Sequence, residues 1–235
     1  MEAREVIRGN LSDVRREVAE ACRHVGRDPD SVKLVAVTKY ADWEWVRHLA
    51  TLHHSFGEAR PQQLAERQPQ LPDVEWHLIG QLQRNKVRIA LQHAALIHSV
   101  DSLKLLERIS TVAGDLKVHP SVLLEVNVSG EASKSGFSSS TLQTEWPQIC
   151  RHAGAVNIAG LMTMAPASDD PENARPAFRG LRKLRDQLAA QPVSQSAGLQ
   201  LPELSMGMSG DFAVAVEEGA TLIRIGSRLF DGLCR

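Results

Sequence analysis

The chain has 235 residues, and its 27 Lys and Arg residues nearly balance its 28 Asp and Glu residues, which leaves a formal net charge of -1. This balance gives no overall attraction to nucleic acid or to an anionic membrane surface, so neither is expected as a partner. Hydrophobic residues make up 43% of the chain and charged residues 23%, as in ordinary globular proteins. The length suits one larger α/β domain or two small ones.

Several features of the sequence indicate a soluble cytoplasmic protein. The charged start, Met-Glu-Ala-Arg-Glu-Val-Ile-Arg, lacks the apolar run of a signal peptide. No stretch approaches the ~18 to 20 apolar residues of a membrane span. The three cysteines, Cys22, Cys150 and Cys234, are scattered and odd in number, which fits a reducing compartment better than a disulfide framework. The histidines do not cluster with other ligand types, so we expect no metal site.

The elements follow one another in a regular alternation. Roughly residues 3–25 repeat apolar positions at helical spacing (Val14, Val18, Cys22), and Gly26 with the following Asp-Pro-Asp turn ends this helix. From Lys33 onward, short apolar runs alternate with longer stretches of helical period. We expect strands at 33–38, 54–56, 74–79, 96–99, 122–128, 158–164, 203–206 and 222–225. Helices are expected between them at 60–68, 84–93, 102–113, 139–152, 170–190 and 209–217.

This alternation predicts the fold class. Strands that alternate with helices pair in parallel through right-handed crossovers, and eight such units in fewer than ~250 residues predict a closed (β/α)₈ barrel. The alternative, an open doubly wound sheet, is disfavoured because no G-x-G-x-x-G follows the first strand. The polar segment from Gln191 to Leu201 is expected to be a surface loop. We therefore expect one α/β domain over residues 1–235, a TIM-type barrel preceded by the helix at about 3–25.

Lys39 is the first candidate functional residue. It follows the apolar strand at the end where such barrels carry out their chemistry. Partial desolvation there would lower the pKa of the amine and make it a nucleophile for a Schiff base. The alternative is a lysine at the rim whose amine simply reaches water.

The last two strands supply the second set of candidates. Barrels often bind phosphate in the loops after these strands, through backbone N–H groups and small residues. Here the candidates are Ser205, Gly207, Ser209, Gly226 and Ser227, and Ser209 is also expected to cap the helix that begins near Asp211.

Arg224 lies inside the eighth strand, where an unpaired charge is costly to bury. It either pairs with a carboxylate such as Glu203 or points into the mouth of the barrel. The first and eighth strands are neighbours in a closed barrel, so Lys39 and Arg224 can reach one small ligand. Pyridoxal phosphate (PLP) suits this combination, because it brings an aldehyde for the lysine and a phosphate for the small residues.

A series of motifs runs through some 190 positions in a fixed order. They are Leu-Val-Ala-Val-Thr-Lys (34–39), Phe56-Gly57-Glu58, Trp76 to Gly80 with Leu82-Gln83 and Asn85-Lys86, Val126-Asn127 with Ser129-Gly130-Glu131 and Ser133-Lys134, Gly160-Leu161-Met162, Ser205 to Ser209 with Asp211, and Arg224-Ile225-Gly226. In this order they resemble the YggS/PROSC family of pyridoxal phosphate homeostasis proteins.

The resemblance implies a barrel similar to the N-terminal domain of alanine racemase, a fold type III PLP protein. It implies that Lys39 forms the Schiff base with PLP, that Arg224 lies near the pyridine nitrogen, and that Ser205, Gly226 and Ser227 hold the phosphate. Met206 is a further expected cofactor-binding residue. His77 and Asn127 are either secondary contacts or structural supports. Two departures stand out: Ala59 replaces the asparagine of the family's F-G-E-N segment, and Phe230-Asp231-Gly232 stands where many members have Phe-Gly.

By this resemblance the protein holds, buffers or delivers PLP in the cell, with little or no catalysis, and apo PLP-dependent enzymes are its expected partners. The alternative is a PLP-dependent amino-acid racemase, which needs acid–base groups on both faces of the cofactor. Only Lys39 is evident as a base, Tyr40 is the single tyrosine, and the chain ends about nine residues after the eighth strand. A metabolic barrel with an unmodified Lys39 is a third interpretation. We expect a monomer.

Overall fold

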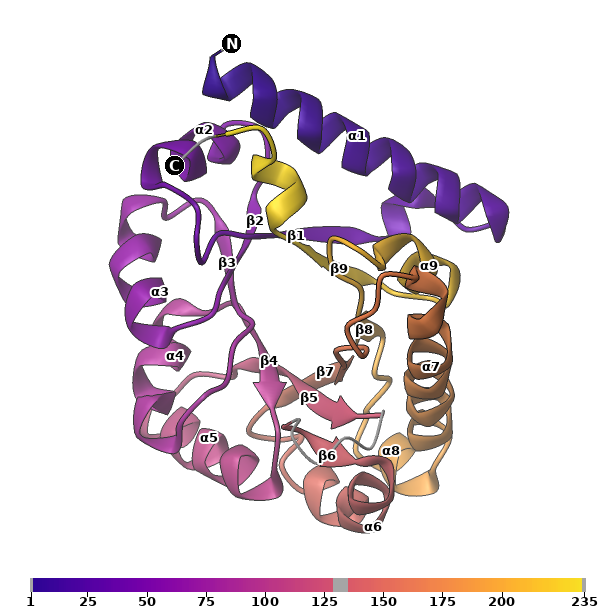
Figure 1. The fold of residues 1–235 in the computed structure, drawn as a ribbon. Helices are drawn as coiled ribbons and strands as arrows, with labels where there is room; N and C mark the ends of the chain where they lie inside the picture. The colour runs from indigo at the N-terminus through magenta and orange to yellow at the C-terminus, as the bar shows by residue number, and fades with distance from the viewer. Residues whose placement is uncertain (1, 129–134, 234–235) are drawn as a thin grey trace.

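The computed structural model describes residues 2–128 and 135–233, in which eight parallel strands close into a barrel (Figure 1). The motif residues Ser129-Gly130-Glu131 and Ser133-Lys134, and Cys234, lie outside the described residues. Each barrel strand pairs with its neighbours in parallel, and β9 pairs with β1 to close the ring. The barrel strands are β1 (Lys33–Val37), β2 (Ser55–Glu58), β3 (Glu75–Leu78), β4 (Leu96–Val100), β5 (Ser121–Asn127), β7 (Asn157–Met162), β8 (Glu203–Ser205) and β9 (Leu222–Ile225).

The predicted barrel is thus confirmed, and all eight predicted strands are present with ends that differ by at most two residues. The short strand β6 (Phe137–Ser138) is an addition; it pairs only with the end of β5. The ends of the parallel strands define a C-terminal mouth, and their starts define an N-terminal mouth.

Helices cover the outside of the barrel (Figure 1). They are α1 (Ala3–His24), α2 (Trp43–Ala50), α3 (Pro61–Arg67), α4 (Val87–His93), α5 (Leu103–Leu116), α6 (Ser139–Cys150), α7 (Arg175–Ala189), α8 (Pro192–Ser196) and α9 (Phe212–Glu217). Short 3₁₀ helices are η1 (Pro29–Ser31), η2 (Gln68–Gln70), η3 (Arg84–Lys86), η4 (Pro171–Ala174) and η5 (Ser227–Phe230). None of the helices in the described ranges is both long and apolar enough to cross a membrane.

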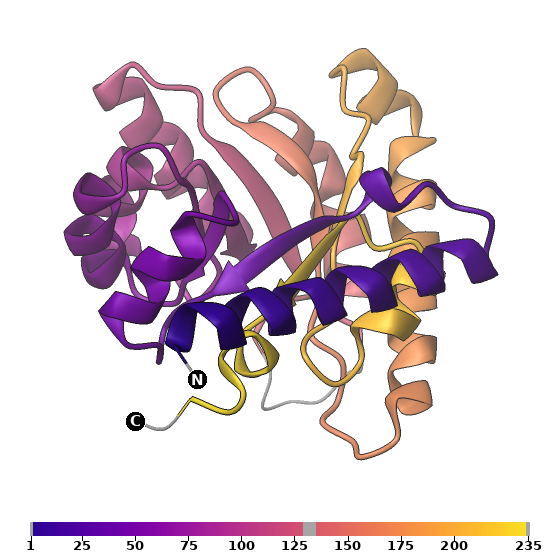
Figure 2. The same ribbon diagram turned by 90° about the horizontal axis from the view of Figure 1, so that it is seen from above.

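Helix α1 precedes the barrel in sequence but lies along its outer wall beside β1, where it contacts α2, α9 and η5 (Figures 1 and 2). Its inner stripe is buried because apolar residues recur every three or four positions; the stripe consists of Ile7, Leu11, Val14, Val18, Ala21 and Cys22. The first helix of the chain thereby packs against η5, the element that follows the last strand.

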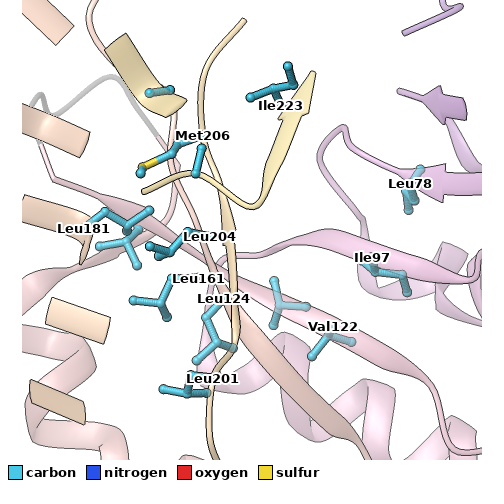
Figure 3. Close-up of a cluster of buried hydrophobic side chains, with 14 of the residues drawn as sticks. Leu78, Ile97, Val122, Leu124, Leu161, Leu181, Leu201, Leu204, Met206 and Ile223 are labelled. Atoms are coloured by element: carbon cyan, nitrogen blue, oxygen red, sulfur yellow. The ribbon is translucent and has the colours of Figure 1, made fainter. Parts of the chain in front are cut away.

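Apolar side chains form two cores, separated by the strands. Because side chains alternate between the faces of a strand, Leu34 and Ala36 belong to the outer core while Val35 lies in the inner one. The outer core fills the space between strands and helices: residues of β5, β7 and β8 lie beside Leu181 of α7 (Figure 3). The inner cluster is small and comes from strands alone, namely Val35, Leu96, Leu123, Met162 and Leu222. The interior of the barrel therefore keeps room for polar side chains.

Two local predictions were wrong. The segment from Gln191 to Leu201 contains helix α8 rather than only loop; Ser194 is buried there and accepts a hydrogen bond from Trp146 Nε1 at 2.8 Å. Ser209 does not cap α9, which begins at Phe212 without a side-chain cap. Instead, the carboxylate of Asp211 accepts a bond from the Met208 N–H at 2.6 Å, so the turn before the helix is closed by Asp211.

Candidate functional site

A pocket of about 630 Å³ opens at the C-terminal mouth of the barrel. Four of the predicted site residues line it together: Lys39, Arg224, Gly226 and Ser227. They come from the ends of β1 and β9, which the barrel closure places side by side. Strand ends that are distant in sequence thus meet at one mouth, as expected for this architecture.

Lys39 lies two residues beyond the end of β1, and its side chain is exposed at the pocket. Its ammonium Nζ lies 4.9 Å from the centre of the Tyr40 ring, close enough for a cation–π contact. The expected partial desolvation of Lys39 is therefore not observed. Because the strand stops at Val37, the amine reaches solvent, and burial is not what would make it reactive.

The backbone beside Lys39 is held by a buried carboxylate. Glu58, fully buried at the end of β2, accepts a hydrogen bond from Thr38 Oγ1 at 2.6 Å and pairs with Arg67. Arg67 also donates to the Thr38 carbonyl at 2.9 Å and lies over the Trp43 ring. Among the described residues, the second carboxylate oxygen of Glu58 has no hydrogen-bond partner. The sequence marked Glu58 only as part of a motif; its observed contacts fix the turn that carries the lysine.

Arg224 presents its guanidinium to the pocket while only 5% of its surface is exposed. It donates to Ser205 Oγ at 2.6 Å and to the Thr163 carbonyl at 3.0 Å. Burial lowers the pKa of Arg224 to about 10, which still leaves it charged at neutral pH. Glu203 accepts a hydrogen bond from Thr221 instead, so the interpretation of a Glu203–Arg224 ion pair is wrong.

The remaining predicted residues separate into two groups. Gly226 and Ser227 lie on the pocket wall, and the Gly226 N–H donates to Ser209 Oγ at 3.3 Å. Ser205 and Met206 are fully buried behind this wall. Ser205 Oγ is engaged by Arg224 and by His98, so its side chain acts within the barrel interior.

Both secondary candidates lie away from the pocket lining. His77 is fully buried inside the barrel, where its ring contacts that of His98. Asn127 is the half-buried last residue of β5. Ala59, which replaces the asparagine of the F-G-E-N segment, lines the pocket and leaves a small apolar surface there.

Sequence reasoning missed Glu125, whose carboxyl lines the pocket from β5. Burial raises the pKa of Glu125, although Ser135 Oγ donates a hydrogen bond to it at 2.8 Å and so opposes the rise. The signal was available: in a strand of period two, Glu125 shares a face with Leu123, which belongs to the inner cluster. A carboxyl on that face has to point into the barrel.

The pocket therefore combines a primary amine, a buried guanidinium, small residues with accessible backbone, and one carboxyl, all within a partly apolar rim. That rim includes Tyr40, Trp45, Met164, Met208 and Phe230. Two cationic groups and a glycine-rich wall suit a small anionic ligand with an aromatic body. The amine adds the ability to bond covalently to a carbonyl group.

Comparison with known proteins assigns the family. The model for the N-terminal domain of alanine racemase matches residues 9–233. The pyridoxal phosphate homeostasis protein of Aquifex aeolicus is 40% identical over 223 residues, which cover 94% of this chain and 95% of that protein. That of Pseudomonas aeruginosa is 37% identical over 225 residues, covering 94% and 93%. The chain belongs to the pyridoxal phosphate homeostasis protein family.

Solved structures agree with this assignment. PipY of Synechococcus elongatus PCC7942, solved with PLP bound, is similar to the chain with a TM-score of 0.77 and 38% identity, over 91% of this chain and 99% of PipY. The alanine racemase of Corynebacterium glutamicum reaches a TM-score of 0.69 at 16% identity, over 96% of this chain and 60% of the racemase. At that identity the racemase shows the shared fold only.

Proposed function

We propose that this protein binds PLP in the pocket at the C-terminal mouth and serves PLP homeostasis by holding, buffering or delivering the cofactor. The observation that carries the proposal is the convergence of Lys39, Arg224, Gly226 and Ser227 on one pocket, in a family whose member PipY has been solved with PLP bound. When bound, PLP supplies an aldehyde that condenses with a primary amine and a phosphate that accepts hydrogen bonds.

The residues present fit this group. We assign the covalent bond to the Lys39 amine, which the pocket leaves accessible. We assign Arg224 to the side of the pyridine nitrogen. A guanidinium keeps its proton and would donate a hydrogen bond without protonating that nitrogen, which would leave the cofactor a weaker electron sink. Gly226 and Ser227 would hold the phosphate through backbone N–H groups and the hydroxyl. Ser205 and Met206 support this wall from behind.

The experiment is a reduction that locks the covalent bond. We expect protein incubated with PLP and then treated with borohydride to carry one pyridoxyl group, located on Lys39 by peptide mass spectrometry. The variant Lys39→Ala should lose this adduct and the absorbance of the bound cofactor. Lys183→Ala removes an exposed lysine of α7 and should retain both. A wild-type protein with no adduct on Lys39 would overturn the proposal.

One observation favours the alternative, an amino-acid racemase: the Glu125 carboxyl with its raised pKa is a second acid–base group in the pocket. We nevertheless infer little catalysis, since Arg224 would weaken the electron sink that racemisation needs. Incubation of the PLP-loaded protein with L-amino acids should produce D-isomers at a negligible rate. If the wild type forms D-isomers rapidly and Glu125→Gln does not, the result would instead favour the racemase.

Delivery to apo PLP-dependent enzymes, and function as a monomer in the cytoplasm, complete the proposal. PLP-loaded protein should restore activity to an apo-enzyme faster than the release of free PLP into solution allows, as measured with a scavenger for free PLP. If apo-enzyme activity returns only as fast as PLP is released into solution, buffering remains the proposed function. Light scattering of the loaded and unloaded protein measures the oligomeric state.

A further inference from the structure

A continuous chain of hydrogen bonds crosses the interior of the barrel from the pocket. Arg224 Nη1 lies 2.6 Å from Ser205 Oγ, and the same oxygen lies 2.8 Å from His98 Nδ1. His98 Nε2 lies 2.8 Å from His77 Nδ1. His77 Nε2 lies 3.0 Å from the Oε1 carboxylate oxygen of Glu75. Side chains from four different strands are thus joined without a gap.

This series of hydrogen bonds connects the C-terminal mouth of the barrel with the N-terminal mouth. Ser205 is the last residue of β8, next to the pocket, whereas Glu75 is the first residue of β3, at the N-terminal mouth. His77, His98 and Ser205 between the two ends are fully buried. At its far end, the second carboxylate oxygen of Glu75 pairs with the ammonium of Lys33 at 2.8 Å. Only Arg224 and Glu75, at the two ends of this series of hydrogen bonds, meet solvent or a ligand.

The chemistry of the two ends is fixed: the guanidinium of Arg224 only donates, and the carboxylate of Glu75 only accepts. Ser205 Oγ therefore accepts from Arg224, and its own hydrogen is free to be donated to His98 Nδ1. At the other end His77 donates from Nε2 to the carboxylate of Glu75, and a proton on His98 Nε2, donated to His77 Nδ1, would give every bond in the series the same direction. The carboxylate end agrees, because hydrogen bonds from His77 and Lys33 lower the pKa of Glu75 to about 2 and leave it an acceptor only.

We propose that Ser205 and His98 are positioning residues that hold the guanidinium of Arg224 toward the ligand, and that the hydrogen bonds through His77 anchor this position to Glu75. The inference rests on the proposed function, because it assigns these residues a task in PLP binding. A hydroxyl that donates strongly also accepts strongly, so each bond in the chain reinforces the next. Without His98, the hydroxyl of Ser205 is free to rotate and Arg224 loses a fixed acceptor.

Substitution of His98 separates this task from mere packing. His98→Gln keeps one acceptor and one donor, while His98→Leu removes both. We expect His98→Leu to weaken PLP binding about tenfold, the loss typical of one hydrogen bond to a charged group, because Ser205 would no longer hold its bond to Arg224; the absorption maximum of bound PLP should also shift. His98→Gln should restore both values to near wild type. The control His152→Leu breaks a His–Ser bond of similar length, 2.9 Å to Ser110 outside the barrel, and should change neither.

The outcomes distinguish this inference from the proposed function. If the wild type binds no PLP, the proposed function fails. If it binds PLP and folded His98→Leu keeps the wild-type affinity and spectrum, only the positioning role is overturned. If His98→Leu does not fold, Glu75→Met tests the half-exposed end of the chain. Although Glu75 lies at the mouth opposite the pocket, its substitution should shift the absorption maximum of bound PLP in a folded protein. An unchanged spectrum would contradict the proposal.

Discussion

Two cationic side chains line one pocket, and they differ in their exposure to solvent. Lys39 is exposed, whereas Arg224 is buried and has a pKa lowered to about 10 by that burial. The carboxylates of Asp211 and Glu125 attract the guanidinium and oppose the decrease. Burial in turn raises the pKa of both carboxyl groups. The charges on this side of the barrel therefore depend on one another, with Glu125 the carboxyl that meets the pocket directly.

Glu125 should make the stability of the protein without PLP depend on pH. Since burial raises its pKa in the folded state above the ordinary value of 4.5, stability from the protonated group is complete below that value. It is lost as the pH rises through the folded-state pKa. Glu125→Gln should thus be more stable than wild type at pH 8 and equal to it at pH 4, as measured by urea unfolding. Glu107→Gln, exposed on α5, should follow wild type at both values; an equal gain there would contradict the assignment.

At the scale of elements, the pairing of β7 with β8 depends on one glycine. Gly160 lies opposite Glu203 in the parallel register. A Cβ at this position would lie 1.9 Å from the Glu203 carbonyl oxygen and 2.7 Å from its carbon, both backbone atoms. Backbone cannot rotate away as a flexible side chain can, so the two strands would have to separate. Ser205, the last residue of β8, would move with them.

Gly160→Ala should therefore destabilise the fold by about 2 to 3 kcal/mol, the upper part of the range for overpacking. Denaturant unfolding monitored by tryptophan fluorescence measures this loss. PLP affinity should decrease as well, because Ser205 supports Arg224. Gly154→Ala is the matched control, since nothing lies within 4 Å of its added Cβ. A neutral Gly160→Ala would show that the strands separate at little cost.

At the scale of the whole molecule, the first helix supports the wall of the pocket. The side-chain amide of Asn10 in α1 donates to the carbonyls of Leu229 and Asp231, at 3.2 and 2.9 Å. Arg228 forms two hydrogen bonds with the carboxylate of Glu17, also in α1. These contacts fix η5, whose first residue is Ser227 on the pocket wall. Segments from opposite ends of the described chain thus stabilise each other.

Asn10→Ala should consequently weaken PLP binding although the residue lies outside the pocket. We expect a loss of about 1 kcal/mol in stability for the bonds removed, and an increase of about threefold in the Kd for PLP. Calorimetric titration and thermal unfolding measure the two effects. Asn157→Ala removes an amide that bonds Ser121 at the N-terminal mouth, at 3.0 Å, and should leave PLP affinity unchanged. An equal loss of affinity in both variants would point to general destabilisation.

The eight barrel strands could be predicted because each is a short apolar run between segments of helical period. Helix α2 was missed, and α8 was predicted as loop because Pro192 and its serines resemble a turn. Pro192 stands in the first turn of α8, where a proline is tolerated. Short helices like these depend on the surface that they cover, which local sequence does not contain.

The pocket was predictable where it depends on strand ends, as for Lys39, Arg224, Gly226 and Ser227. Glu125 was missed although the alternation within β5 directs it inward. The series of hydrogen bonds through His77 and His98 could not be predicted. It depends on the register of β4 against its neighbours and on which strands face one another once the barrel has closed. Register between distant strands is a property of the assembled sheet and not of any one segment.

The pairing of β1 with β9 makes the pocket depend on two segments that are synthesised far apart in time. About 185 positions separate Lys39 from Arg224, and a ribosome adds ~5 to 20 residues per second. The lysine therefore emerges roughly 10 to 40 seconds before its partner across the pocket exists. A nascent chain that ends before β9 lacks Arg224, Gly226 and Ser227, so the pocket is incomplete until the ring has closed. The pocket described above is thus a property of the finished protein.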